Sequence, residues 1–305
     1  MLVSIIIPTH NRVKLLKNAI YSIINQTYQK FEIIIIDDAS TDNTQNFILS
    51  LDDKRIKYFK NKVNLYAAES RNIGICKSKG DLIAFLDDDD EWFPYKLEKQ
   101  VHLFEDKKIG LVYSSINLFF EKYNFSYNTK PILNGYIYKE MLIKNYIGST
   151  PSVIVRREAI FDMDNNKNKF FDSKFPAREE YDLWIRLCKK WDVKYVKVPL
   201  LRQFQRNSID RISGNVNNYV NAIELLNLKY KSEVIKVLSK KQRRSRIFYQ
   251  KFFLGSQAVK INNLKLARKY FFDAFKINKN FKTLVIYFAT FFGPRLILKL
   301  RSYKK

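Results

Sequence analysis

The sequence predicts an α/β domain with a mostly parallel sheet, followed by an all-helical extension. Short apolar runs alternate with helical periods as far as about residue 90, which is typical of α/β proteins. The second run, residues 31–36, is an unbroken apolar segment rich in β-branched residues, as expected of a parallel strand buried on both faces. The third observation is that only helical periods occur after about residue 215.

The first four strands are separated by helices. We expect strands at residues 3–7, 31–36, 56–59 and 82–86, and helices at 14–25, 42–51 and 67–77. Such a strand–helix–strand succession implies parallel pairing with right-handed crossovers. Residues 111–160 are less regular, with short aromatic-rich strands and a helix at 138–144, and another helix is expected at 179–190.

The C-terminal part reads as helices at 219–238, 246–261 and 264–277. The last two have the spacing of one tetratricopeptide unit, but at least three such units are needed to form a solenoid. We therefore expect a helical pair that packs on the preceding domain, and we expect most of Phe248, Tyr249, Phe252 and Phe253 to lie in its core. The predicted division is residues 1–214 and residues 215–305.

The formal net charge of +25 is unevenly distributed. Residues 1–198 contain 31 basic and 26 acidic residues, whereas residues 199–305 contain 24 basic and four acidic ones. A lysine-rich coding bias would not remove acids from one part of the chain alone. A basic segment of this kind suggests nucleic acid or an anionic membrane surface as partner. We expect the membrane and no nucleic acid, because residues 281–300 interleave basic with apolar side chains and no nucleic-acid-binding motif occurs.

Three features concern the cellular location. Cys76 and Cys188 cannot form a disulfide framework, which favours a reducing compartment. The first residues lead into an apolar run without the basic segment of a signal peptide, and no uncharged apolar run reaches the ~20 residues of a spanning helix. The expected location is the cytoplasm, with peripheral association at the inner face of the cell membrane.

The most unusual segment is a run of five acids at 87–91, directly after an expected strand. Their mutual repulsion is costly unless a cation lies among them, and Mg²⁺ or Mn²⁺ prefers such ligands while keeping positions for substrate phosphates. Asp37 and Asp38 end the strand 31–36 in the same way. We expect these two strands to be adjacent, so that their acids meet at the sheet edge where open α/β sheets bind ligands. An isolated acidic run would more often be a solvated turn, but its position after a strand favours a site.

A third acidic group, Glu179, Glu180 and Asp182, opens the helix expected at 179–190. Acids in a first turn complement the helix dipole, which is a sufficient structural reason for them. The functional interpretation is a general base that deprotonates an incoming hydroxyl group.

Three of these segments, VSIIIPTHNR at 3–12, IDDASTD at 36–42 and AESRNIG at 68–74, closely resemble the opening of family 2 glycosyltransferases. The acidic run resembles the DxD motif of that family, and residues 179–186 resemble its ED-type motif ahead of an LWxR helix. The ordered set covers roughly residues 1–210. It implies a GT-A fold, which is Rossmann-like with a mostly parallel mixed sheet flanked by helices. It also implies inverting transfer of a sugar from a nucleotide-diphosphate sugar, typically a UDP-sugar.

The resemblance also implies roles for single residues. Pro8, Thr9 and Asn11 would line the nucleotide pocket, Asp38 would contact the base, and Arg71 would reach the ribose or the diphosphate. Asp87 would hold the ribose or a metal-bound water, Asp88 would lie beside it in the donor site, and Asp89 would ligate the Mg²⁺ or Mn²⁺ that bridges the diphosphate.

Two positions depart from the family pattern. The position of the base carries Glu180 in place of Asp, and Asp182 stays open as an alternative base. Where the family often has a His near residue 200, this chain has Arg202 and Arg206, and either would neutralise the diphosphate directly.

The prediction is an inverting, metal-dependent glycosyltransferase of surface polysaccharide, lipopolysaccharide or glycoprotein glycan synthesis. Its acceptor would be a glycan or a polyprenyl-diphosphate-linked sugar, as for many enzymes of this type. A nucleotidyltransferase is an alternative, but it would need a glycine-rich phosphate loop, and residues 8–12 contain no glycine. An inactive transferase-like scaffold is the other alternative. The presence of Asp87, Asp89 and Glu180 argues against it.

Overall fold

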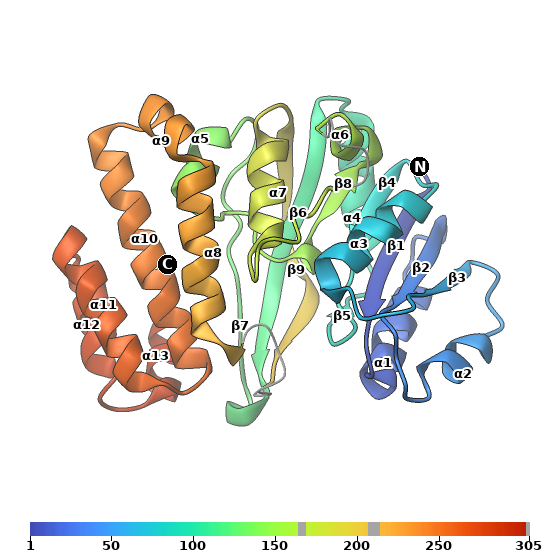
Figure 1. Cartoon of the computed structure of the whole chain (residues 1–305), viewed down its shortest axis with the longest axis horizontal. Coiled ribbons are helices and arrows are strands. Elements are labelled where there is room, and N and C mark those ends of the chain that lie inside the picture. The colour runs from blue at the N-terminus through green and yellow to red at the C-terminus, as the bar shows by residue number, and fades with distance from the viewer. Residues whose placement is uncertain (164–168, 207–213, 303–305) are drawn as a thin grey trace.

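The computed structural model describes residues 1–163, 169–206 and 214–302. A mixed sheet runs through the molecule with helices on both faces, and a layer of helices stands beside it (Figure 1). The strands are β1 (Val3–Thr9), β2 (Phe31–Asp37), β3 (Ile56–Lys60), β4 (Leu82–Phe85), β5 (Glu91–Trp92), β6 (Ile109–Phe120), β7 (Phe125–Asn128), β8 (Ile154–Arg156) and β9 (Asp192–Gln205). Their order is β3-β2-β1-β4-β8-β6-β9-β5, and β7 pairs with β6.

The N-terminal strands form the expected parallel set. β1 pairs in parallel with β2 on one side and β4 on the other, and β3 extends the set beyond β2. The acid-bearing strands β2 and β4 are therefore separated by β1 and are not direct neighbours. Beyond β4 the sheet becomes mixed, because β8 runs antiparallel to both β4 and β6, while β6 and β9 run parallel.

Alternating residues of the central strands supply two cores, one on each face of the sheet. Ile5 and Ile7 pack in a cluster with α1 and α4, and Ile6 packs in a cluster with α3, α5 and α7. Burial of both faces explains why these strands are continuous apolar runs. The helices are α1 (Val13–Ile24), α2 (Thr44–Leu49), α3 (Tyr66–Lys77), α4 (Lys96–Val101), α5 (Tyr138–Ile143), α6 (Arg157–Phe161) and α7 (Glu179–Cys188).

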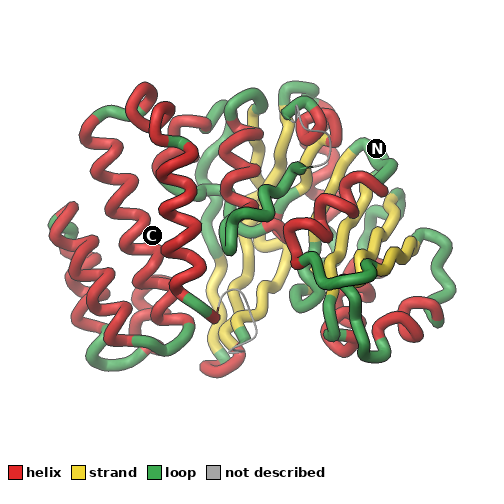
Figure 2. Tube along the Cα trace, in the orientation of Figure 1, coloured by secondary structure: helices red, strands yellow, loops and turns green. Residues whose placement is uncertain are grey.

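The C-terminal part is helical throughout its described residues, as predicted (Figure 2). Its helices are α8 (Val216–Lys229), α9 (Lys231–Val237), α10 (Lys240–Lys260), α11 (Leu264–Asn278), α12 (Phe281–Ala289) and α13 (Pro294–Ser302). The prediction of a single helix at 219–238 is wrong, because α8 ends before Tyr230 and α9 begins after it. α10 begins earlier than expected, at a capping box made by Ser239 and Gln242. The α10–α11 hairpin is confirmed, and Gly255 allows the ring of Phe271 to approach the backbone, since a Cβ there would lie 2.8 Å from it.

The helical layer packs against the sheet domain through polar and apolar contacts. Leu226 and Tyr230 belong to the same core cluster as the residues of α7. Arg246 of α10 is 4% exposed and donates hydrogen bonds to the carbonyl of Leu142 and to Oδ1 of Asn227. The packing of the helices on the preceding domain is thus confirmed, while the division into residues 1–214 and 215–305 stays a prediction. Within the described part of the chain, no helix combines the length and the apolar character needed to cross a membrane.

Candidate active site

A cavity of about 940 Å³ lies between the carboxyl ends of β1, β2 and β4 and the helices α8, α10 and α12. Most of the predicted site residues line it, namely Pro8, Thr9, Asp38, Arg71, Asp87, Asp88, Asp89 and Glu180. Three do not belong to its lining, namely Asn11, Asp182 and Arg206. The expectation that acids from separate strands meet at one sheet edge is therefore confirmed.

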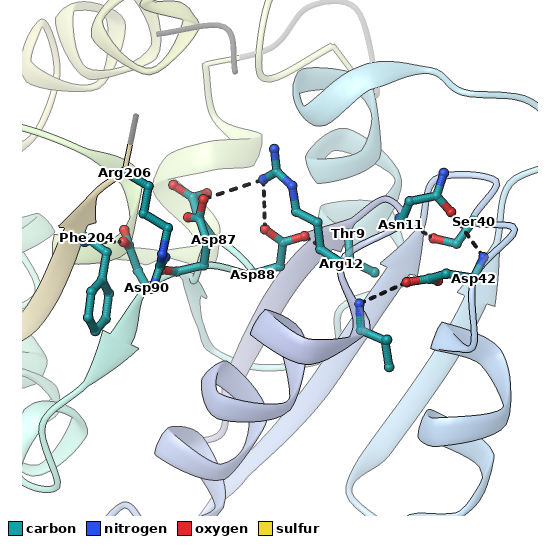
Figure 3. A network of polar contacts seen from close by, with 12 residues as sticks. Thr9, Asn11, Arg12, Ser40, Asp42, Asp87, Asp88, Asp90, Phe204 and Arg206 are labelled. Carbon is teal, nitrogen blue, oxygen red and sulfur yellow. Dashed lines mark hydrogen bonds and ion pairs between the residues drawn. The ribbon is translucent and has the colours of Figure 1, made fainter. Parts of the chain in front are cut away.

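Asn11 connects two loops behind the cavity wall. Its Oδ1 accepts hydrogen bonds from the backbone N–H groups of Thr41 and Asp42, at 2.7 and 3.2 Å, and its own N–H donates to Oγ of Ser40 (Figure 3). Its φ of 53° lies in the left-handed region that asparagine tolerates. The place of Asn11 in the nucleotide pocket stays a prediction: in this structure Asn11 fixes the loop after β1, and the neighbouring Arg12 lines the cavity.

Asp88 is buried and held from two sides. Its Oδ2 accepts a hydrogen bond of 2.9 Å from Oγ1 of Thr9, and its Oδ1 lies 3.2 Å from Nη1 of Arg12 (Figure 3). The same Arg12 nitrogen lies 3.5 Å from Oδ2 of Asp89. Burial raises the pKa of Asp88, although Arg12 and Thr9 act against that shift. Asp88 thus anchors Arg12 over the acidic run, which suits a place beside the donor.

Asp90 and Arg206 fix the turn that carries the acidic run. Asp90 is 2% exposed and accepts hydrogen bonds from the backbone N–H of Phe204 and from Nε2 of Gln203. Burial and the charge of Asp87 raise its pKa well above the ordinary value. Arg206 donates a 2.7 Å hydrogen bond to the backbone carbonyl of Asp89 and pairs with Glu121. Its contact with the diphosphate stays a prediction, and in this structure Arg206 braces the turn from the end of β9.

Arg71 of α3 joins two acidic motifs that are far apart in sequence. Its Nη2 lies 2.7 Å from Oδ1 of Asp87, and its Nη1 lies 2.9 Å from Oε1 of Glu179. The guanidinium is buried, and the two carboxylates outweigh the effect of burial and raise its pKa. Among the described residues, its Nε has no hydrogen-bond partner. Arg71 therefore fixes the separation between the acidic run and the opening of α7.

Asp38 is engaged with the loop that leads into α3. Its Oδ1 accepts hydrogen bonds of 2.8 Å from the N–H of Leu65 and from Nδ2 of Asn61, and its Oδ2 accepts one of 2.7 Å from the N–H of Tyr66. The carboxylate is 4% exposed and still lines the cavity. It thereby fixes the cavity wall on which Tyr66, 71% exposed, is presented.

Glu180 and Asp182 point to different surroundings, although both open α7. Glu180 lines the cavity, and burial together with the charge of Glu179 raises its pKa to about 7. Asp182 is completely buried, and its carboxylate contacts three donors. They are Nε of Arg186 at 2.9 Å, the hydroxyl of Tyr230 at 2.8 Å and Nζ of Lys229 at 2.8 Å. Asp182 therefore anchors α8 and α9 to α7, which also accounts for the helix break at Tyr230.

The acidic run fits a divalent cation that arrives with a diphosphate. Among the described residues, no group of three or more His, Cys, Asp or Glu side chains is arranged to hold a metal ion by itself. Mg²⁺ commonly needs only one or two carboxylates, because substrate phosphates and waters complete its shell. Asp87 and Asp89 line the cavity with side chains 28% and 12% exposed. Burial is the main cause of the raised pKa values of Asp88 and Asp90, and the charge of Asp87 adds to both shifts.

Several cavity residues have no counterpart in the sequence predictions. His10 lines the cavity, and its Nδ1 lies 2.6 Å from the backbone carbonyl of Asp38. Arg178, directly before the acidic pair, lines it as well. Phe248 and Phe252 of α10 were expected in the core, and they pack there while also facing the cavity. No spacing rule marks such residues, because they come from segments brought together only by the packing of α10 on the sheet domain.

The fold is that of a glycosyltransferase of the GT-A type. Among solved structures, the mannosyltransferase PcManGT of Pyrobaculum calidifontis, in complex with GDP-Man and Mn²⁺, aligns over 98% of this chain and 85% of its own, with a TM-score of 0.59 and 14% identity. TarS 1–349 of S. aureus aligns over 100% and 91%, with a TM-score of 0.55 and 13% identity. At these identities the likeness establishes the fold.

The family model for glycosyl transferase family 2 matches residues 4–165, and the chain belongs to this family. An uncharacterised glycosyltransferase of Haemophilus influenzae is 28% identical over the full length of both chains. WfaP of Escherichia coli, a UDP-Glc:α-D-GlcNAc-diphosphoundecaprenol β-1,3-glucosyltransferase, is 32% identical over 70% of this chain and 80% of its own. The protein is thus a glycosyltransferase, and relatives of it act on polyprenyl-diphosphate-linked sugars.

Proposed function

We propose that the protein transfers a sugar, with inversion, from a UDP-sugar to a polyprenyl-diphosphate-linked acceptor in polysaccharide synthesis. The observation that carries this proposal is the shared cavity of Glu180 and the acidic run, in which the pKa of Glu180 is raised to about 7. A carboxylate of that basicity accepts a proton from a hydroxyl near neutral pH far better than an ordinary one. The name of WfaP, with its UDP-linked donor and diphosphoundecaprenol acceptor, supports the choice of substrates.

In the proposed reaction Glu180 takes the proton of the acceptor hydroxyl while that oxygen attacks the anomeric carbon from the face opposite the diphosphate. This is one displacement, so no protein nucleophile is required. Asp89, with Asp87 beside it, would hold Mg²⁺ or Mn²⁺, which neutralises the charge that develops on a leaving diphosphate. Arg71 contacts both Asp87 and Glu179, and it would keep the donor and acceptor sides in register. Pro8, Thr9 and Asp38 would form the wall of the nucleotide pocket.

A donor screen tests the proposal. UDP-Glc, UDP-GlcNAc and GDP-Man would each be incubated with Mn²⁺ or Mg²⁺ and with N-acetylglucosaminyl diphosphate on an alkyl chain, and release of the nucleotide and formation of the glycoside would be followed. We expect one UDP-sugar to react, Asp89→Ala to lose this activity, and Asp162→Ala, at an exposed position, to keep it. Metal-dependent turnover that is unchanged in Asp89→Ala would contradict the metal assignment. Transfer with GDP-Man alone would contradict the choice of donor.

We further propose that α12 and α13 rest on an anionic membrane surface. Phe281 and Phe288 of α12 and Phe291 and Phe292 of the turn that follows are 78, 54, 54 and 78% exposed. The same two helices carry the exposed cations Lys282, Arg295 and Lys299. Aromatic residues interleaved with cations are typical of helices that lie in a membrane interface. Each Lys or Arg near such a surface adds about 1 kcal/mol of attraction. A cytoplasmic location at the inner face of the membrane would give the enzyme access to a lipid-linked acceptor.

A further inference from the structure

The cavity has ends of opposite charge. The side chains that line it from the sheet domain include Asp38, the acids at 87–90, Glu179 and Glu180, which outnumber Arg12 and Arg71, both paired with acids of this group. The part of its lining that comes from α8 onward contains Lys260, Lys282 and Arg301, and no acid among the described residues. Lys144 and Arg178 belong to the basic end as well, since they lie 4.7 and 4.2 Å from the ring centres of Tyr249 and Phe253 of α10. A metal-bound diphosphate suits the acidic end, whereas the basic end would attract an anion without a metal.

Arg178 is the buried cation of this basic end. It is 9% exposed, and its guanidinium carbon lies 4.5 Å from the ring centre of Tyr181 and 4.2 Å from that of Phe253. Within the described residues it has these ring contacts but no hydrogen bond or ion pair, unlike Arg71 with its two carboxylates. Its φ of 63° places a non-glycine residue in the left-handed region, which is sterically costly.

The guanidinium of Arg178 lines the cavity without an acceptor among the described residues, and a bound anion would accept hydrogen bonds from its N–H groups. The guanidinium fork matches phosphate oxygens in a bidentate geometry. Burial lowers the pKa of Arg178, and an anionic ligand would reverse that effect. Glu180, two residues along the chain, is close enough for its charge to act on Arg178.

The surroundings of Arg178 are apolar and aromatic. The lining on this side includes Ile223, Leu226, Phe248, Phe252 and Ile286. Nζ of Lys144 lies 4.7 Å from the ring centre of Tyr249, which also faces the cavity. Phe281, which follows the lining residue Asn280, is 78% exposed. This combination of a cation and apolar walls suits a ligand with a phosphate group next to a hydrocarbon chain.

We propose that Arg178 binds the phosphate of the acceptor, so that the basic end of the cavity is a subsite for a sugar diphosphate on a lipid chain. This inference rests on the proposed function and assigns its acceptor specificity to a particular side chain. Because Arg178 is two residues before Glu180 and feels its charge, a phosphate on Arg178 would lie near the hydroxyl that Glu180 deprotonates. An acceptor sugar without the diphosphate would forfeit this contact.

Binding of octyl diphosphate, measured by titration calorimetry on the full chain in EDTA, tests this assignment. EDTA removes the metal on which diphosphate binding at the acidic end would depend. We expect Arg178→Gln to weaken binding at least tenfold, while Arg244→Gln, the same change at an exposed position of α10, leaves it unchanged. Octyl glucoside, which has the chain but no phosphate, should bind wild type and Arg178→Gln alike. UDP should not displace octyl diphosphate.

Equal affinity of wild type and Arg178→Gln for octyl diphosphate would overturn the inference, and so would displacement by UDP, since the ligand would then occupy the donor site. If Arg178→Gln does not fold, Lys282→Gln replaces it, because that lysine is exposed and lines the same end of the cavity. It should weaken binding several-fold, and no change would reject the subsite. Failure of the donor screen together with Arg178-dependent binding would reject the proposed function but not the anion site.

Discussion

The two ends of the cavity are built in different ways. At the acidic end the buried carboxylates are held by backbone N–H groups, hydroxyls and arginines, as Asp38 is by three donors and Asp88 by Thr9 and Arg12. At the basic end the side chains come from separate helices, and Arg178 is held by ring contacts alone among the described residues. A preorganised polar site suits the reacting groups, whose positions must be fixed before charge develops. A wall of aromatic and long basic side chains tolerates a variable lipid.

The largest expected effect distinguishes two acids of one helix. Glu180→Gln should lower transfer by about 10²–10⁴-fold, the usual contribution of a general base, while donor binding is kept. Asp182→Asn should chiefly lower the melting temperature, because Arg186, Lys229 and Tyr230 lose their charged partner. Steady-state kinetics with thermal melts of both variants would check this. Full activity in Glu180→Gln would move the base elsewhere.

A second prediction concerns the contact between the helical layer and the sheet domain. Arg246 carries the helical layer onto α5, and Arg246→Met would leave the buried carbonyl of Leu142 without this donor. We expect a loss of about 2–3 kcal/mol in the free energy of unfolding, the usual range for a hydrogen bond to a charged group. Lys241→Met, on an exposed position of α10, is the matched control. Urea denaturation of the three proteins measures the effect, and equal midpoints would show that Arg246 does not hold the layers together.

The acidic end could be predicted from sequence to a much greater extent than the basic end. The strand–helix alternation and the apolar β1 and β2 specify a parallel sheet, and acids after β2 and β4 must then share an edge. Side-chain direction was not readable in this way. Glu180 and Asp182 both lie in the first turn of α7. Only the packing of Tyr230 and Lys229 shows that the carboxylate of Asp182 is engaged in structural contacts.

The basic end depends on contacts between distant segments. Arg178 meets Phe253 across the interface between α7 and α10, and neither residue belongs to a periodic pattern that indicates the other. The aromatic residues of α10 were expected in a core because amphipathic helices usually bury them. The charge count did indicate that this region is basic, since it distinguished the basic residues 199–305 from the nearly neutral residues 1–198.

A third prediction tests the outer side of the helical layer. Phe288→Ser with Phe292→Ser should weaken binding to vesicles of anionic phospholipid several-fold, because both rings are more than half exposed on α12 and in the turn that follows. Raising the salt concentration should weaken binding of the wild type as well, since the basic residues act through screened charge. The control is Leu49→Ser with Leu228→Ser, which removes exposed apolar side chains elsewhere. Sedimentation with vesicles is the measurement, and equal losses in both pairs would assign the effect to general hydrophobicity.

The smallest expected effect is a gain in stability on losing the base. The pKa of Glu180 is raised from 4.5 to about 7 in the folded protein, so folding favours its protonated form. Stability from this group is fully present below pH 4.5 and is lost as the pH rises through about 7. At pH 8, Glu180→Gln should therefore be more stable than wild type by about 1 kcal/mol, a value reduced for partial solvent screening. At pH 4 the two proteins should melt alike.

Transfer by the wild type should rise with pH through about 7, because only the ionised carboxylate takes the proton. A stability difference that does not change with pH would show that Glu180 is an ordinary surface acid, and the preorganised end of the cavity would then lack its base.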